Sequence, residues 1–146
     1  MIILRPPRPD EGETLARLFT ASRKLLDFLP QLHTPAEDIV FITTKVLPAY
    51  RITVAEVDGA IAGYMADEPH EVQQLYLDPG FLRQGIGTAL MNDVKARNDW
   101  LALWCFEQNH RGRAFYTRHG FVEIGRSDGD TNPEGAADIR FRWQRG

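Results

Sequence analysis

The chain has only one cysteine among its 146 residues, Cys105. One cysteine cannot form an internal disulfide, so the sequence lacks the cross-linked framework of small secreted domains, and we expect a reducing cytoplasm. Cys105 lies in an apolar run, which predicts a place in the core. The four histidines and this cysteine do not have the spacing of metal ligands, so no metal site is predicted.

Long hydrophobic runs and an excess of basic charge are also missing. No stretch approaches the length of a membrane-spanning helix, so we expect no membrane partner. The 17 basic and 20 acidic residues give a net charge of -3. Nucleic-acid binders usually present a basic face, so we expect no nucleic-acid partner. The length suits one domain with a real core, residues 1–146.

Two common phosphate-binding motifs are absent. A P-loop requires a Gly-Lys pair, and none occurs in the chain. The dinucleotide fingerprint requires a third glycine where this chain has Leu90, and an acidic residue about 20 positions later, where Glu107 is the nearest match. That fingerprint also normally lies in a first βαβ unit, whereas about 85 residues precede Gly85.

The glycine-rich stretch that is present still predicts an anion site. The strand-like run Val72–Leu77 leads through a short loop into a helix that begins near Gly85 and Gly87. The first turn of a helix has N–H groups without partners and a partial positive charge, so anions bind there. A glycine has no side chain, so a pyrophosphate can approach the backbone closely. The stretch therefore predicts a phosphorylated cofactor.

Hydrophobic periodicity and turn residues predict the secondary structure. Helices are expected from Asp10 to Leu29, from the capping box Thr34–Glu37 to about Val46, over Gly85–Arg97 and over Arg111–Arg118. Strands are expected at Ile2–Arg5, Arg51–Val57, Ala60–Ala66, Glu71–Leu77, Leu101–Phe106, Phe121–Arg126 and Asp138–Trp143. The strand Leu101–Phe106 is apolar throughout, as expected of a strand covered on both sides.

Two motifs, in this order, resemble those of the GNAT superfamily of N-acetyltransferases. Phe81–Met91 resembles the acetyl-CoA pyrophosphate loop, Gln/Arg-x-x-Gly-x-Gly/Ala, with Leu82 at the Gln/Arg position. Asn109–Phe121 resembles the second signature, Asn-x-x-Ala-x-x-Phe-Tyr-x-x-x-Gly-Phe, with Gly112 at the Ala position. The element order also matches the family layout. The resemblance thus implies an α/β (α+β) fold, a single domain with a mixed central sheet of about seven strands and about four flanking helices.

The resemblance implies acetyl-CoA (coenzyme A) as the cofactor. The loop residues expected to hold the pyrophosphate are Leu82, Arg83, Gln84, Gly85, Ile86, Gly87 and Thr88. Backbone N–H groups of about Leu75, Tyr76 and Leu77 would bind the pantetheine and the acetyl carbonyl, where they stabilise a developing oxyanion. Asn109 would bond the pantetheine or serve as a helix N-cap. Arg83 and Gln84 could compensate for the apolar Leu82.

Two residues are expected to act in catalysis. By resemblance, Tyr116 lies where many family members place a general acid beside the CoA sulfur, and a phenol is protonated at neutral pH. The alternative role for Tyr116 is packing on a helix face. Glu71 is the only carboxylate on its strand and is the candidate base, although a solvated strand-end glutamate fits equally well. Glu68, His70 and Asp138 are weaker candidates.

The predicted activity is transfer of an acetyl group from acetyl-CoA to a primary amine, by direct attack in a ternary complex. The alternative is a non-catalytic GNAT-like module that binds acyl-CoA or a metabolite. In the family, the segments equivalent to 25–35 and 127–138 shape the acceptor site. The carboxylates of the second segment would favour a cationic amine, although such residues are also common in turns. A small-molecule amine, a peptide amine and a homodimer all stay open.

Overall fold

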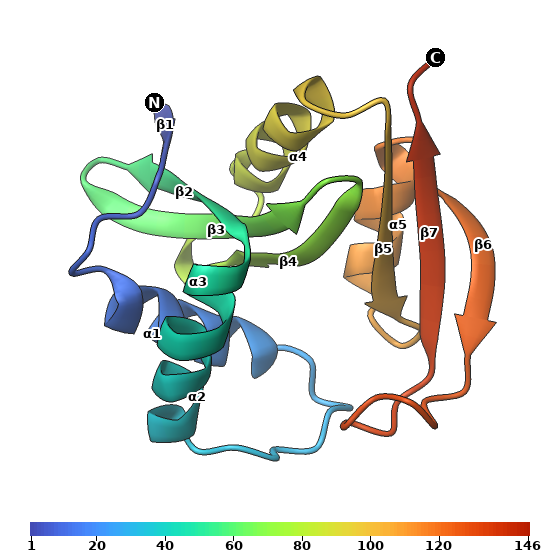
Figure 1. Cartoon of the computed structure of the whole chain (residues 1–146), viewed down its shortest axis with the longest axis horizontal. Coiled ribbons are helices and arrows are strands. Elements are labelled where there is room, and N and C mark those ends of the chain that lie inside the picture. Colours follow the sequence, from blue (N-terminus) through green and yellow to red (C-terminus); the bar gives the residue numbers. More distant parts are fainter.

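The computed structural model describes residues 1–146 and has a seven-stranded mixed sheet in the order β1-β2-β3-β4-β5-β7-β6 (Figure 1). The strands are β1 (Ile2–Arg5), β2 (Arg51–Val57), β3 (Ala60–Glu68), β4 (Glu71–Leu77), β5 (Trp100–Phe106), β6 (Val122–Ser127) and β7 (Asp138–Gln144). The helices are α1 (Gly12–Arg23), α2 (Pro35–Phe41), α4 (Ile86–Ala96) and α5 (His110–Arg118), and a π-helical turn (Ile42–Val46) joins α2 to the short α3 (Leu47–Ala49). The predicted fold class and element order are confirmed.

The first half of the sheet is covered on both faces, and its strands alternate accordingly. Val54 and Tyr64 face α1 and the α2 segment, where they join a core that includes Leu15 and Ile42. Met65 points the other way, into the larger core built around α4 and β5. This period of two is what a strand with two covered faces requires. None of the helices has the length and apolar character that crossing a membrane requires.

The sheet opens between its two central parallel strands. β4 pairs with β5 at one position only, Glu71 with Ala102, and beyond it the two strands run apart (Figure 1). On its other edge β4 stays paired with β3 as far as Leu77. The edge of β4 that faces β5 therefore leaves backbone groups without ladder partners, and these groups need another partner or water.

The first helix is shorter than predicted. α1 ends at Arg23, and its N-cap is Glu11 rather than Asp10. Beyond Arg23 the chain forms turns, in which Leu25 and Leu26 donate to carbonyl oxygens three residues back. The leucines of this segment do not continue the apolar stripe of α1 on the core. Leu25 and Leu26 line a cavity instead, so their apolar character serves the cavity and not a longer helix.

The expectation that β5 is covered on both sides was also wrong. Leu101 and Leu103 are buried, whereas Trp104 on the opposite face is half exposed. No helix covers that face, since α4 and α5 both lie on the other side of the second half of the sheet (Figure 1). The guanidinium of Arg140 lies over the Trp104 ring, 5.4 Å from its centroid, and shields part of it.

Candidate active site

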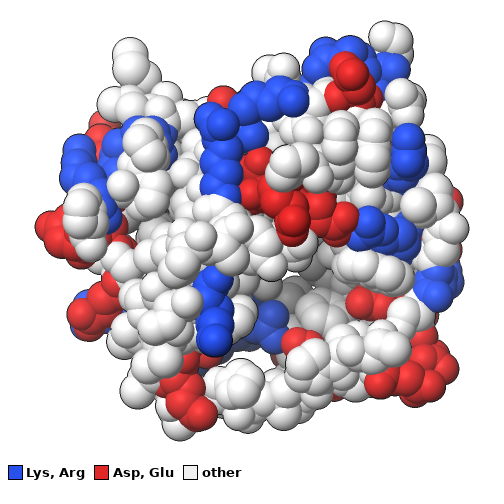
Figure 2. All heavy atoms as spheres, viewed as in Figure 1, with Lys and Arg blue, Asp and Glu red and all other residues white.

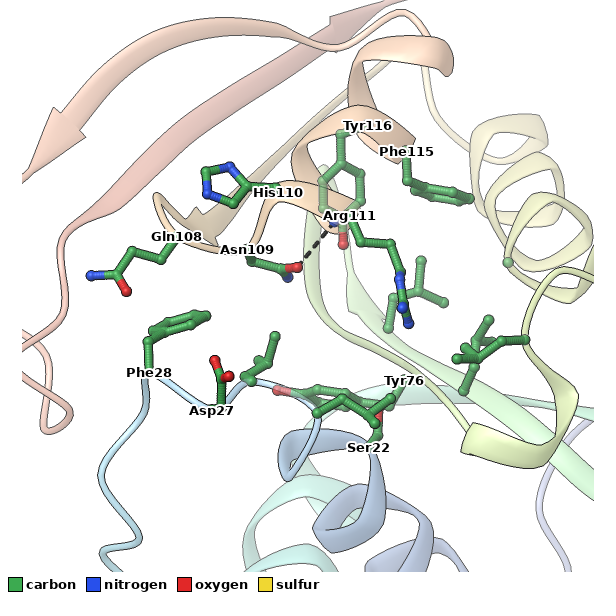
Figure 3. A pocket seen from close by; sticks show the side chains of 17 residues that line it. Ser22, Asp27, Phe28, Tyr76, Gln108, Asn109, His110, Arg111, Phe115 and Tyr116 are labelled. Carbon is green, nitrogen blue, oxygen red and sulfur yellow. Dashed lines mark hydrogen bonds between the residues drawn. The ribbon is translucent and has the colours of Figure 1, made fainter.

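A cavity of about 300 Å³ lies where β4 and β5 separate. Its walls come from three parts of the chain: the 22–28 segment after α1, the end of β4 with the start of α4, and the 108–116 segment around the start of α5. On the face shown in Figure 2 the surface is hollowed between the two halves of the molecule, and acidic and basic groups are both present, without a continuous basic surface. Figure 3 shows the polar side chains that reach the cavity.

The start of α4 has the geometry of an anion site. Gly85 is the N-cap residue with φ +80°, a left-handed conformation that glycine adopts without strain. No side chain caps the helix. A Cβ at Gly85 would meet no atom within 4 Å, so this backbone is open to a ligand. The first turn of α4 thus presents free N–H groups and the positive end of the helix dipole.

Gly87 has a second role that the sequence did not indicate. A Cβ at this position would lie 3.0 Å from Cε1 of Phe115, closer than ordinary contact allows. The missing side chain therefore lets Phe115 of α5 pack directly against the first turn of α4. Gly87 lines the cavity together with Leu82 and Leu77, so the same glycine joins the two helices and shapes the site.

Tyr116 projects from α5 into the cavity (Figure 3). Its ring packs edge-on against Phe115 and Phe121, with centroids 5.4 and 5.7 Å apart. Burial raises the pKa of the Tyr116 phenol above its ordinary value, and Cys105 and Tyr76 add smaller effects in the same direction. The phenol is consequently protonated at neutral pH and directed at the cavity.

Asn109 has the predicted N-cap role, and its contact with the pantetheine stays a prediction. It is the N-cap residue of α5, and its Oδ1 accepts a hydrogen bond of 3.0 Å from the Gly112 N–H. The same side chain lines the cavity, beside Gln108 and opposite Asp27 (Figure 3). The absence of a side chain at Gly112 leaves room for the capping amide, because a Cβ there would lie 2.5 Å from the Asn109 amide nitrogen and clash with it.

The far wall of the cavity contains a carboxylate that sequence analysis did not single out. Asp27 comes from the turns after α1 and points toward Asn109, next to the ring of Phe28 (Figure 3). The segment 25–35, expected at the acceptor side, supplies both residues. The sequence signal for Asp27 is a single acidic residue between apolar neighbours. Arg111 also reaches the cavity, from the first turn of α5 (Figure 3).

The two segments expected to shape the acceptor site approach each other. Arg23 at the end of α1 lies 3.8 Å from the carboxylate of Glu134 in the loop between β6 and β7. Arg23 also donates to the hydroxyl of Tyr76, at 3.3 Å, and Tyr76 lines the cavity. In Figure 1 the chain after α1 and the β6–β7 loop come together below the opening of the sheet. Arg23 thus links the end of α1 to the β6–β7 loop by an ion pair and to β4 by a hydrogen bond.

Glu71 lies outside the cavity lining. Both of its carboxylate oxygens accept hydrogen bonds from Arg140 of β7, at 2.6 and 2.7 Å. This bidentate pair bridges β4 and β7 across β5, at the point where the sheet begins to open. The geometry favours a structural role for Glu71, with its lone pairs engaged by the guanidinium.

The weaker candidates for the base are also engaged or lie elsewhere. Glu68 accepts from Gln73 at 2.6 Å, and the His70 ring stacks on Trp100 with centroids 4.2 Å apart. Asp138 begins β7, and one of its oxygens, Oδ1, is buried without a hydrogen-bond partner. None of these three residues lines the cavity.

Apart from Glu71, the predicted site residues divide into three groups. The structure brings seven of the thirteen predicted site residues to the cavity: Leu75, Tyr76, Leu77, Leu82, Gly87, Asn109 and Tyr116. Arg83, Gln84, Gly85 and Thr88 are exposed on the loop and first turn of α4, beside the cavity rather than in its lining. Ile86 is buried in the core, so only its backbone can face a ligand.

Comparison with known proteins identifies the family. The family model for the acetyltransferase (GNAT) domain matches residues 48–123. The peptidyl-lysine N-acetyltransferase YjaB of Salmonella typhimurium is 30% identical over 132 residues, which cover 89% of this chain and 90% of that protein. The protein of the same name from Escherichia coli is also 30% identical, over 89% of this chain and 88% of its own length.

Solved structures show the same fold. The solution structure of apo-form YjaB from Escherichia coli superposes with a TM-score of 0.84 at 24% identity, covering 100% of this chain and 99% of the other. The PaiA N-acetyltransferase of Thermoplasma acidophilum, solved in complex with coenzyme A, gives a TM-score of 0.73 at 20% identity, with 99% of each chain covered. These relatives favour an enzyme over a non-catalytic binding module. The chain belongs to the GNAT superfamily of acetyl-CoA-dependent N-acetyltransferases.

Proposed function

We propose that this protein transfers the acetyl group of acetyl-CoA to a primary amine, by direct attack of the amine while both substrates are bound. The observation that carries the proposal is the cavity at the opening of the sheet. The unpaired edge of β4, the first turn of α4 and the phenol of Tyr116 all reach it or border it. Acetyl-CoA supplies an acetyl group that its thioester already activates. The protein therefore has to bind and orient the two substrates and to assist the transfer of protons.

The chain offers fitting partners for the pyrophosphate, the pantetheine and the acetyl group of the cofactor. The uncapped first turn of α4 and the open backbone at Gly85 suit the pyrophosphate. The free backbone groups on the edge of β4 suit the amides of the pantetheine, as an added strand would. The N–H groups of Leu75 and Leu77 are the donors on that edge available to the acetyl carbonyl oxygen, since the Asp78 N–H bonds Ala62 on the β3 side and N–H groups alternate along a strand.

Tyr116 is the proton donor in this proposal. Its phenol holds its proton, since burial raises the pKa above the ordinary value of about 10. A thiol has a pKa of about 8.5, well below that of the phenol, so the phenol stabilises the departing thiolate by donating a hydrogen bond and loses its proton only if the proton released by the amine replaces it. In the overall reaction a C–N bond forms, the C–S bond breaks, and the proton lost by the amine balances the proton gained by the sulfur.

The acceptor enters, in this proposal, between the 22–28 segment and the start of α5. A lysine-like amine has a pKa near 10.4, so at neutral pH it arrives mainly as a cation and must lose one proton to solvent before its nitrogen can attack. Asp27 is the carboxylate on the cavity wall, and we place it, rather than Glu71, opposite the acceptor. Because the YjaB relatives are named peptidyl-lysine N-acetyltransferases, a lysine side chain in a peptide is the first acceptor class to test.

Initial rates of thiol release, measured while acetyl-CoA and a lysine-containing peptide are both varied, test this proposal. Direct attack predicts intersecting lines in double-reciprocal plots, since both substrates must be bound before any product leaves. Parallel lines would indicate an acetylated enzyme and contradict the mechanism. Tight CoA binding without thiol release across peptide and small-molecule amines would return the chain to the binding-module alternative.

A further inference from the structure

The last turn of α5 contacts the first turn of α4 through a pair of polar side chains that the proposed reaction does not use. The Nε2 atom of His119 lies 3.2 Å from the hydroxyl oxygen of Thr88. Thr88 is the third residue of α4, directly after Gly87. The contact is built on the close approach of the two helices at Gly87, because the His119 ring lies against Phe115, with centroids 4.3 Å apart.

The chemistry of this pair depends on which atom donates. A threonine hydroxyl has one proton to give and lone pairs to accept with. If Thr88 donates to an unprotonated Nε2, its only proton is used within the protein. If His119 donates an N–H to the Thr88 oxygen, the hydroxyl proton is free for another acceptor. An imidazolium must donate from Nε2, since both of its nitrogens carry protons.

We propose that His119 is a positioning residue for the pyrophosphate of acetyl-CoA: it donates to Thr88, directs the Thr88 hydroxyl proton to a phosphate oxygen, and takes up a proton when the cofactor binds. The inference rests on the proposed place of the pyrophosphate at the start of α4. It adds a pH-dependent contact to a site otherwise built of backbone N–H groups.

The charges around His119 favour such coupling. Desolvation first, and then Lys95 and Arg118, lower the pKa of His119. Lys95 also donates to the backbone oxygen of His119. No carboxylate is among the groups that shift it. A bound pyrophosphate would be the nearest strong negative charge and would raise the pKa. The cofactor should then bind more tightly below the pKa of the complex, and this gain should be lost as the pH rises through it.

Titration with 3′-dephospho-CoA tests the proposal cleanly. A phosphate monoester has a second pKa of about 6, which would add its own pH dependence, whereas the pyrophosphate of dephospho-CoA has no such group. We expect the dissociation constant to be roughly 3- to 10-fold lower at pH 5.5 than at pH 7.5, since one pKa unit corresponds to a factor of ten. Calorimetry in two buffers of different ionisation enthalpy should show net proton uptake near pH 6.

Three variants locate the titrating group. His119→Asn keeps a donor for Thr88 but cannot titrate, so binding at pH 7.5 should persist while the pH dependence and the proton uptake disappear. Thr88→Val removes the hydroxyl and should also flatten the pH dependence. His70→Asn is the matched comparison, because His70 lies outside the cavity lining and Asn tolerates the positive φ of this position, and this variant should keep the wild-type profile.

Each alternative result has a distinct meaning. Dephospho-CoA binding that does not change with pH in the wild-type protein, or that keeps its pH dependence in His119→Asn, would overturn the role of His119 alone. Loss of the pH dependence in His70→Asn, with the dependence kept in His119→Asn, would assign it to His70 and overturn the proposal. Absence of any binding of CoA compounds would overturn both this inference and the proposed cofactor site.

Discussion

Tyr116 is the residue whose proposed role is most open to a direct test. Replacement by Phe keeps the ring and its contacts with Phe115, Phe121 and Phe141 but removes the phenol. We expect Tyr116→Phe to lower kcat by about 100-fold, in the range of general acid catalysis, and to leave the affinity for acetyl-CoA within about threefold. Thiol-release kinetics and calorimetric titration measure the two effects. Unchanged turnover would return Tyr116 to a packing role.

Asp27 and Glu71 make a matched pair of carboxylates with different expected roles. Asp27→Asn removes the negative charge on the cavity wall, so we expect KM for a cationic amine to rise by about 3- to 10-fold, since pairs of this kind contribute about 1 kcal/mol in a solvated site. Glu71→Gln breaks the bidentate pair with Arg140, so its main effect should be lower stability. Acceptor kinetics and urea unfolding of both variants separate these effects. A large loss of kcat in Glu71→Gln with unchanged stability would restore Glu71 as the base.

At the scale of elements, local patterns predicted most of the fold. β1, β2 and β4 have the expected bounds, because alternating residues and flanking turn residues specify a strand without reference to distant partners. The capping box at Thr34 and Glu37 is present with both of its hydrogen bonds, and α2 begins where it predicts. Gly85 marks the start of α4, since a left-handed N-cap requires a residue that tolerates positive φ.

The features that sequence analysis missed depend on tertiary neighbours. The spacing of Leu25 and Leu26 predicts a continued helix, but these side chains line a cavity and do not pack on a core. The apolar run around Trp104 predicts a buried side chain, whereas Trp104 is half exposed. The sequence does not indicate that no helix covers this face of the sheet. The proposed base on β4 depends on a partner 69 positions away in sequence, Arg140, which no local pattern indicates. The motifs indicated the proposed cofactor side and the resemblance indicated the two acceptor segments, whereas Asp27 as a residue of the cavity wall emerged only from the structure.

Across the whole molecule, one network of ion pairs joins β1, the start of α1 and β2. Arg5 of β1 donates to Glu11 before α1 and to Glu56 of β2, at 2.8 and 2.9 Å. The hydrogen bond from Arg5, with further help from Arg8, lowers the pKa of Glu11 to about 2. The side chains of Arg5 and Glu11 are only 14% and 13% exposed, so solvent screens this pair weakly.

This network predicts an acid-sensitive part of the stability. The folded-state pKa of Glu11 is below its unfolded value, so the pair stabilises the fold above about pH 4.5 and the contribution is lost as the pH falls toward about 2. We expect Glu11→Gln to lower the free energy of unfolding by about 1–3 kcal/mol at pH 6 and by clearly less at pH 3. Urea unfolding of both proteins at the two pH values measures this. An equal difference at both would contradict the assignment.

The central claim is that acetyl-CoA binds with its pyrophosphate at the start of α4. Gly85 provides the cleanest test, because its Cβ would meet no atom within 4 Å and both Asp and Asn tolerate positive φ better than other side chains. Asp and Asn have nearly the same shape, so Gly85→Asn is a matched control for the charge in Gly85→Asp.

The decisive measurement is calorimetric titration of the wild type and these two variants with acetyl-CoA. We expect saturable binding by the wild type, a dissociation constant within a few-fold of the wild-type value for Gly85→Asn, and binding weaker by at least about tenfold for Gly85→Asp, since like charges repel at this range. Equal affinities of the Asp and Asn variants would show that the pyrophosphate lies elsewhere and would contradict the proposed cofactor site.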